Sequence, residues 1–256
     1  MSLVLLEKII DNFFAVMPRS KPSLDPAHPV RLIAHRGAHN HAQGIIENTL
    51  PAFRLAAKAG CWGIELDVHA TADHILVVNH DPTLKRLWGL DLRIAHLTFA
   101  DLRAQVPEIP MLAEVVAEFG GRVHLFIELK KPFTSEMALI QILQGLQAVT
   151  DYHLLTLEAS VFADLSHIPK SAMLLVASHN NMTAFCDLSL DNHYGGVLGH
   201  YLLLTTKLAK RLKANGQEVG VGLVDSKYSM YRELRKGIYW LFTNNVAVVS
   251  NNLNAL

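Results

Sequence analysis

The feature that most constrains the fold is the alternation of short apolar runs with helical stretches from residue 30 onward. The runs are rich in β-branched and aliphatic side chains, whereas the stretches between them carry apolar residues at helical spacing. Such alternation favours parallel strands joined by right-handed helical crossovers. The predicted strands are 30–34, 63–68, 75–79, 123–129, 153–157, 172–177, 196–198, 218–224 and 239–242.

The length of 256 residues suits a single (β/α)8 barrel domain, because such barrels commonly occupy about 250 residues. The predicted helices are 50–59, 111–119, 135–149, 161–166, 205–214 and 229–236. Nine predicted strands are one more than the barrel needs, and the pattern does not identify the surplus strand. The region 63–79 has no room for a helix, so we expect a hairpin-like irregularity there. The segment 82–110 is long enough to form a short insertion above the barrel.

Two parts are therefore predicted, an N-terminal helix with its connector over 1–29 and the barrel domain over 30–256. The helix over 1–17 places Leu3, Leu6 and Ile10 near one face. We interpret it as a lid across the bottom of the barrel, and the alternative is peripheral contact with a membrane surface. Charged residues within the helix argue against a secretory signal. No segment is long and apolar enough to predict a transmembrane span.

Composition limits the partners of the chain. It has 23 basic and 23 acidic residues, so no global field attracts nucleic acid, and phosphate must be recognised locally. The two cysteines, Cys61 and Cys186, cannot form a disulfide framework. A reduced, cytoplasmic setting is therefore expected.

Polar residues gather where the predicted strands end. In a parallel barrel all strand C-termini open on one face, and this face holds the active site. Four consecutive predicted strands would deliver their polar residues to this single mouth. These residues are His35, Arg36, Glu65, Asp67, His80, Glu128 and Lys130.

Three acidic residues are candidate metal ligands. Glu65 and Asp67 are two apart on a predicted strand, so both side chains point to the same face. Two carboxylates inside a barrel repel each other unless a proton or a cation joins them. With Glu128 from another strand they offer hard oxygen ligands, which suit Ca²⁺ or Mg²⁺. The alternative is a buried salt-bridge network with Lys130 and Arg36.

His35 and His80 are candidates for acid–base chemistry, because histidine titrates near neutral pH and both follow strands. Cleavage of a phosphodiester needs a base for the attacking oxygen and an acid for the leaving alkoxide. The chain has 14 histidines, and position alone singles out these two. The remaining histidines that we considered are interpreted as ordinary surface or packed residues, namely His39, His41, His96, His167 and His193.

Arg36 offers a planar fork of donors that matches phosphate oxygens, and Lys130 is a point charge beside the predicted metal site. Asn48 or Thr49 is expected to cap the helix that starts near Leu50. Helix capping does not explain Glu47, which is predicted to orient Arg36 or to touch the metal.

Taken together, the motifs resemble those of the glycerophosphodiester phosphodiesterase family. In chain order they are His35-Arg36-Gly37, Glu47-Asn48-Thr49, Glu65-Leu66-Asp67-Val68, Val77-Val78-Asn79-His80-Asp81 and Glu128-Leu129-Lys130. The resemblance covers roughly residues 30–131. It implies a TIM barrel of the phosphatidylinositol-phospholipase-C-like phosphodiesterase type.

The resemblance also implies the chemistry of the site. Glu65, Asp67 and Glu128 would bind a divalent cation, Ca²⁺ or Mg²⁺ with Mn²⁺ as a further candidate, and His35 and His80 would be the catalytic pair. The phosphate-binding residues would be Arg36 and Lys130, with Glu47 and Asn48 in support. The implied reaction releases an alcohol from a small glycerophosphodiester and leaves glycerol 3-phosphate, a step of glycerol and lipid metabolism. Either water or the substrate's own glycerol hydroxyl would attack.

The second half of the chain departs from the family pattern. Leu157-Glu158-Ala159 stands where Ser-Phe is common, and Gly222-Leu223-Val224-Asp225 stands where Trp-Thr-Val-Asn is common, although Thr243-Asn244 is kept. The missing tryptophan leaves substrate identity open. One alternative is a lysophospholipase D, with the N-terminal helix and the run 201–204 meeting an acyl chain. A more remote alternative is a non-catalytic phosphate-binding barrel. The sequence does not predict the head group or the oligomeric state.

Overall fold

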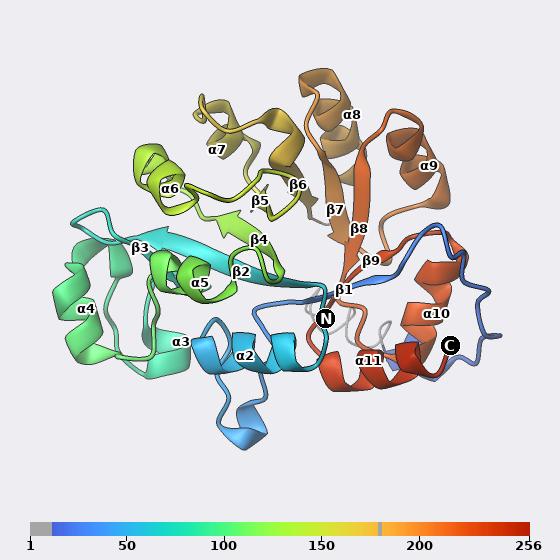
Figure 1. The fold of residues 1–256 in the computed structure, drawn as a ribbon, viewed down its shortest axis with the longest axis horizontal. Coiled ribbons are helices and arrows are strands. Elements are labelled where there is room, and N and C mark those ends of the chain that lie inside the picture. The colour runs from blue at the N-terminus through green and yellow to red at the C-terminus, as the bar shows by residue number, and fades with distance from the viewer. Residues whose placement is uncertain (1–11, 179–180) are drawn as a thin grey trace, which may run out of the picture.

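A computed structural model describes residues 12–178 and 181–256 of the chain. Eight parallel strands form a closed barrel at its centre (Figure 1), as predicted. The barrel closes because β1 pairs with β9 on one side and with β2 on the other. Its strands are β1 (Arg31–Ala34), β2 (Gly63–Ala70), β4 (His124–Leu129), β5 (Tyr152–Thr156), β6 (Met173–Ala177), β7 (Gly196–His200), β8 (Glu218–Gly222) and β9 (Trp240–Thr243).

Helices surround the barrel and cover the outer faces of the strands. They are α2 (Leu50–Lys58), α5 (Leu112–Phe119), α6 (Glu136–Ile142), α7 (Ala159–Ala163), α8 (Met182–Asn192), α9 (Thr206–Ala214), α10 (Lys227–Arg235) and α11 (Val246–Asn254), with 3-10 turns η1 (His41–Gln43) and η3 (Lys170–Ala172). The sequence analysis missed α8 and α11. A smaller apolar cluster that includes Phe126 and Trp240 fills the barrel interior.

The surplus strand is β3 (Leu76–Val78), which lies outside the barrel and pairs antiparallel with β2. β2 continues past the barrel rim, and β3 turns back along it with Val78 opposite Val68. The expectation that a parallel barrel strand carries His80 to the mouth is therefore wrong, because the strand before His80 is antiparallel and lies outside the barrel. The returning strand of the expected hairpin brings His80 back to the rim instead.

The predicted insertion after β3 is a small folded unit. It contains α3 (Lys85–Trp88), η2 (Ile94–His96) and α4 (Phe99–Gln105). Its own core is made of buried aliphatic side chains, which also include Val77 of β3. These side chains are Val77, Leu84, Ile94, Leu102, Val106 and Ile109. The shared Val77 fixes the insertion to the hairpin, beside the mouth.

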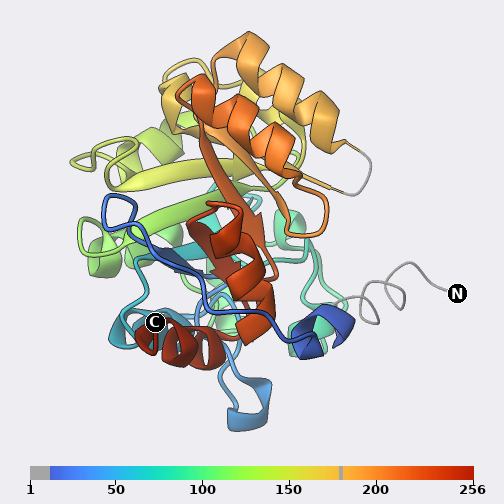
Figure 2. The same ribbon diagram turned by 90° about the vertical axis from the view of Figure 1, so that its right-hand side faces the viewer.

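The N-terminal helix was expected to cover the bottom of the barrel, and its described part does not. Residues 12–16 are helical, and the Phe14 ring lies 6.4 Å from the Tyr201 ring, edge to face. Tyr201 directly follows β7, so this contact is on the mouth side (Figure 2). Residues 1–11 of the predicted helix lie outside the described part of the chain. Among the described residues, no helix is long and apolar enough to cross a membrane.

Candidate active site

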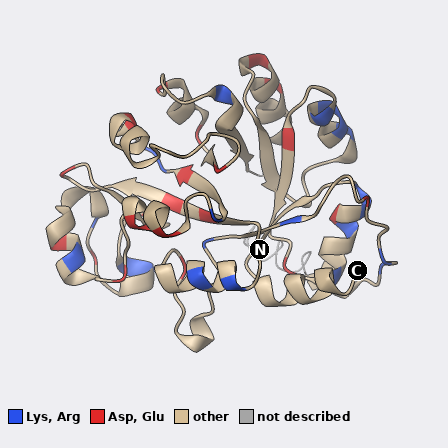
Figure 3. Cartoon of the chain, viewed as in Figure 1, with Lys and Arg blue, Asp and Glu red and all other residues tan. Residues whose placement is uncertain are grey.

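Three carboxylates converge inside the barrel near its mouth. Glu65 and Asp67 lie on β2, and Asp67 stands opposite Glu128 of β4 in the parallel register. One oxygen from each of the three lies within 4.8 Å of the others. Leu66 and Val68, which alternate with these carboxylates along β2, point to the outer core, as the period of two requires. The structure thus brings together the three predicted ligands, and Figure 3 shows acidic segments on β2 and β4.

Two cations lie against this cluster. The Lys130 ammonium contacts Asp67 Oδ1 at 2.7 Å and also Glu128 Oε1. Arg36 Nε lies 3.3 Å from Asp67 Oδ2. If all three carboxylates ionise, they exceed these two cations by one negative charge, and the buried Oε1 of Glu65 has no hydrogen-bond partner. A hard divalent cation fits this excess charge and this free oxygen.

The protonation behaviour of the cluster agrees with a cation site. Burial and the Asp67 carboxylate raise the pKa of Glu65 to about 8, and the same two causes raise the pKa of Glu128 to about 7. Burial also opposes ionisation of Asp67, but Lys130 and Arg36 hold the pKa of Asp67 well below its usual range. Without added positive charge, the three groups therefore do not all ionise readily at neutral pH.

A cavity of about 340 Å³ opens at the mouth, and its lining has two chemically different parts. One part is charged and contains Glu65, Glu128 and the two predicted catalytic histidines. The other part is aliphatic and aromatic, from β5 to β9. The polar lining is His35, Arg36, Glu65, His80, Glu128 and Lys130, and the apolar lining includes Leu155, Leu157, Val176, Leu198, Leu203, Leu223 and Phe242. The mouth thus presents a charged region beside an apolar wall.

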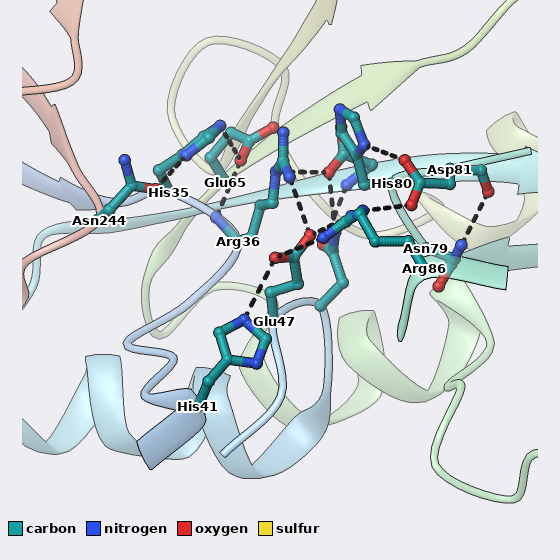
Figure 4. A network of polar contacts seen from close by, with 12 residues as sticks. His35, Arg36, His41, Glu47, Glu65, Asn79, His80, Asp81, Arg86 and Asn244 are labelled. Atoms are coloured by element: carbon teal, nitrogen blue, oxygen red, sulfur yellow. Dashed lines mark hydrogen bonds and ion pairs between the residues drawn. The ribbon is translucent and has the colours of Figure 1, made fainter. Parts of the chain in front are cut away.

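His35 is held by an amide that is itself fixed. Asn244 donates its Nδ2 and backbone N–H groups to Asp225, at 3.1 and 2.7 Å. This leaves Asn244 Oδ1 to accept from His35 Nδ1 at 2.7 Å (Figure 4). The tautomer follows: Nδ1 carries the proton, and Nε2 keeps a lone pair. Burial and the Arg36 charge lower the pKa of His35, which favours its neutral form.

His80 has a different partner. Its Nδ1 lies 2.8 Å from Asp81 Oδ1, so a carboxylate rather than an amide holds the ring. Burial lowers the pKa of His80, whereas the Asp67 and Asp81 carboxylates favour the imidazolium. His69 Nε2 also lies 3.0 Å from the backbone carbonyl oxygen of His80. The two histidines therefore line one cavity, but the Nδ1 atom of His35 contacts an amide whereas that of His80 contacts a carboxylate.

The supporting residues are placed by the loop after β1. Glu47 Oε1 accepts from Arg36 Nη1 at 2.8 Å, so Glu47 orients Arg36, which is one of its two predicted roles. Thr49 occupies the N-cap position of α2, but its side chain makes no capping hydrogen bond and its Oγ1 donates to the Ile46 carbonyl oxygen at 2.7 Å. Asn48 does not cap the helix: it has a φ of 59° and donates Nδ2 to Asp67 Oδ2 at 2.8 Å. Asn48 thereby fixes a candidate metal ligand.

Sequence reasoning did not assign a role at the site to Asp81, Arg86, Asp225 or Asn244. Asp225 and Asn244 follow β8 and β9 closely, so the strand-end criterion used for His35 would have found them. No pattern in the sequence indicates that Arg86 contacts the site, because its contacts depend on how the insertion folds back.

A family model described as the Glycerophosphoryl diester phosphodiesterase family matches residues 35–248. The chain belongs to this family. The match extends well beyond the motifs of the first half and includes β9 with Asn244.

The relatives within the glycerophosphoryl diester phosphodiesterase family differ in name and length. Glycerophosphodiester phosphodiesterase 1 of Bos taurus is 37% identical over 50% of this chain and 42% of the relative. Lysophospholipase D GDPD1 of Homo sapiens is 34% identical over 40% of this chain and 31% of the relative. The chain spans less than half the length of these mammalian relatives. An Oleispira antarctica phosphodiesterase, solved in complex with the product sn-glycerol-3-phosphate, shares the fold with a TM-score of 0.73. It is 21% identical, and the match covers 89% of this chain and 98% of that phosphodiesterase.

Proposed function

We propose that the protein is a metal-dependent phosphodiesterase that converts glycerophosphodiesters to glycerol 3-phosphate and an alcohol. The observation that carries this proposal is the cluster of Glu65, Asp67 and Glu128 beside two histidines in one cavity. Membership in the glycerophosphoryl diester phosphodiesterase family supports the reaction class. The product named for the Oleispira antarctica relative supports the choice of glycerol 3-phosphate.

In this proposal Glu65, Asp67 and Glu128 hold a divalent cation, Ca²⁺, Mg²⁺ or Mn²⁺. The cation supplies Lewis acidity and neutralises charge on the phosphate oxygens. Arg36, fixed by Glu47, donates its guanidinium N–H groups to the same phosphate. The Lys130 ammonium has three donors, so it can contact a phosphate oxygen while it remains beside Asp67.

The unlike partners of the two histidines assign their roles. His35 has a neutral amide partner and a lone pair on Nε2, so we assign it as the base for the attacking oxygen. His80 has a carboxylate partner that stabilises the imidazolium, so we assign it as the acid for the leaving alkoxide. Each proton transfer then uses the form of the imidazole that its hydrogen-bond partner favours.

A hydrolysis panel tests the proposed function. It contains glycerophosphocholine, glycerophosphoethanolamine, glycerophosphoglycerol and lysophosphatidylcholine, each assayed with Ca²⁺, Mg²⁺ and Mn²⁺ and with excess EDTA. We expect glycerol 3-phosphate from at least one glycerophosphodiester, loss of activity in EDTA and recovery with one of the cations. No turnover of any substrate would favour a non-catalytic phosphate-binding barrel. Full activity in EDTA would refute the cation site.

The apolar part of the cavity favours a second candidate function, a lysophospholipase D. Leu157 and Leu223 are 41% and 37% exposed at the rim, although both are large aliphatic residues. Leu223 has a φ of 63°, a left-handed conformation that is costly for a non-glycine residue. Such strain at a cavity rim is typical of functional positions. An acyl chain on the substrate would cover these side chains.

Replacement of Leu223 by asparagine should separate the two candidates, because asparagine tolerates the same backbone conformation and is polar. If lysophospholipids are the substrate, we expect kcat/KM for lysophosphatidylcholine to fall about tenfold, with glycerophosphocholine turnover nearly unchanged. Met137→Asn is the control, since Met137 is exposed on α6 and does not line the mouth cavity. Equal effects of Leu223→Asn on both substrates would count against an acyl-binding wall.

We also propose peripheral contact with a membrane surface and a cytoplasmic location. Phe13, Val16 and Met17 are exposed on and just after the described part of the N-terminal helix, and Phe14 fixes this helix on the mouth side. A lipid surface at the mouth would cover the exposed side chains. Cys61 and Cys186 are both free and buried, which agrees with a reduced compartment.

A further inference from the structure

Arg86 of the insertion reaches back to two residues of the candidate active site. Its Nη2 and Nη1 atoms donate to Glu47 Oε1 and Oε2, at 2.8 and 3.3 Å. Its Nε donates to Asp81 Oδ2. Figure 4 shows Glu47 between Arg36 and Arg86, and Asp81 between His80 and Arg86. Glu47 therefore connects Arg86 to Arg36, the proposed phosphate-binding arginine. Asp81 connects Arg86 to His80, the proposed catalytic histidine.

The fold of the insertion fixes the direction of this side chain. Leu84 precedes α3 and is fully buried in the core of the insertion. Trp88 ends α3 and donates its indole N–H to Asn79 Oδ1 at 3.2 Å. Asn79 lies directly before His80 and donates to the Asp81 carbonyl oxygen at 2.8 Å. Both ends of this short helix are thus attached to the hairpin that carries His80.

The contacts of Arg86 exclude a simple role in phosphate binding. All three of its guanidinium nitrogens donate to carboxylates, and Glu47 is the largest cause of its raised pKa. Arg86 is not among the described residues that line the 340 Å³ cavity. Its side chain is also 45% exposed, so its ion pairs contribute little to global stability.

We propose that Arg86 is a positioning residue, which acts through Glu47 on Arg36 and through Asp81 on His80. This inference rests on the proposed function, because it concerns the geometry of the same reaction. Glu47 Oε1 accepts from both arginines at 2.8 Å, so its position depends on both. Without Arg86, Glu47 and Asp81 each lose a partner that holds them in place. Arg36 and His80, which depend on these carboxylates, can then leave the catalytic geometry. A displacement of about 1 Å at a catalytic group costs on the order of 10²-fold in rate.

The first test is Arg86→Met, which keeps the length of the side chain and removes its charge. We expect kcat/KM for glycerophosphocholine to fall by about 30-fold, with a Tm within about 3 °C of the parent. The matched control is Arg103→Met, because Arg103 is in the same insertion and forms a half-buried ion pair with Glu114 at 2.6 Å. We expect this control to keep parental activity. Parental activity in Arg86→Met would overturn the inference.

A mutant cycle distinguishes positioning from direct contact with the substrate. Arg86→Met is combined with Glu47→Gln, with Asp81→Asn, and with both together. If Arg86 acts through these two carboxylates, its loss has a smaller effect in each single background and almost none in the double background. An undiminished 30-fold loss in the double background would show that Arg86 acts on the substrate directly and would contradict the inference.

A crystal structure of Arg86→Met provides a readout that does not depend on activity. We expect the His80–Asp81 or the Arg36–Glu47 hydrogen bond, both 2.8 Å in the parent, to be lost. Retention of both contacts would overturn the positioning role even if the parent hydrolyses nothing. Inactivity of the parent across the substrate panel would instead refute the proposed function.

Discussion

Replacement of His80 by alanine is expected to lower kcat for glycerophosphocholine by about 10³-fold, and replacement of His35 by a similar factor. In the proposed mechanism each histidine transfers a proton in the transition state, and a positioned imidazole contributes about 10²–10⁴-fold to such a step. KM should change little, because Arg36 and the cation bind the phosphate. Steady-state kinetics with saturating cation measure both quantities.

His96→Ala is the matched control for the histidine variants, since His96 is exposed on the insertion and does not line the mouth cavity. It should keep the parental kcat. A His35→Ala variant that hydrolyses as fast as the parent would refute acid–base catalysis by this residue and would remove it from both candidate functions.

The pH–rate profile of the parent should be bell-shaped for the same reason. The base must be neutral, so the rate rises with pH through the pKa of His35, which burial and Arg36 lower from 6.5. The acid must be protonated, so the rate falls as pH rises through the pKa of His80 in the substrate complex. A flat profile from about pH 5 to 9 would contradict the assignment.

Replacement of Glu65 by glutamine is expected to lower cation-dependent activity by about 10³-fold or more. The same replacement is expected to stabilise the cation-free protein. Glutamine has the shape of glutamate, so packing is kept and a charged ligand is lost. Burial and Asp67 raise the pKa of Glu65 from 4.5 to about 8. Glu65 therefore lowers the free energy of unfolding of the cation-free protein. This destabilisation is absent below pH 4.5 and grows as pH rises toward 8.

At pH 8 the cation-free Glu65→Gln variant should be more stable than the parent by several kcal/mol, because the pKa of Glu65 is raised from 4.5 to about 8 in the fold and one pKa unit corresponds to about 1.4 kcal/mol. Urea titrations in EDTA at pH 5 and pH 8 measure this difference. Glu118→Gln is the control, since Glu118 forms a surface ion pair with Arg54. A variant that is less stable than the parent at both pH values would contradict the repulsion.

The sequence predicted the barrel and the polar side of its mouth because both follow from local patterns. Strand and helix periods do not depend on distant contacts, and the strand-end rule places Glu65 and Glu128 on one face without a structure. The same rule gave the correct destination of His80, although β3 runs antiparallel and lies outside the barrel.

The contacts that hold the histidines could not be predicted in this way. Asn244 meets His35 because the barrel closes between β9 and β1, two strands about 200 residues apart in sequence. The contacts of Arg86 depend on the packing of Leu84 in the insertion core. The N-terminal helix has an amphipathic pattern that predicts a buried face but not which surface it covers. Phe14 instead packs beside Tyr201 at the mouth.

An anomalous difference map from crystals of the protein soaked in Mn²⁺ is the most direct measurement of the cation site. We predict one strong peak bound by an oxygen from each of Glu65, Asp67 and Glu128, at about 2.0–2.6 Å, the range of hard divalent cations. His35 and His80 should flank this peak. No peak at saturating Mn²⁺, with the Lys130 ammonium alone among the three carboxylates, would contradict a metal-dependent phosphodiesterase.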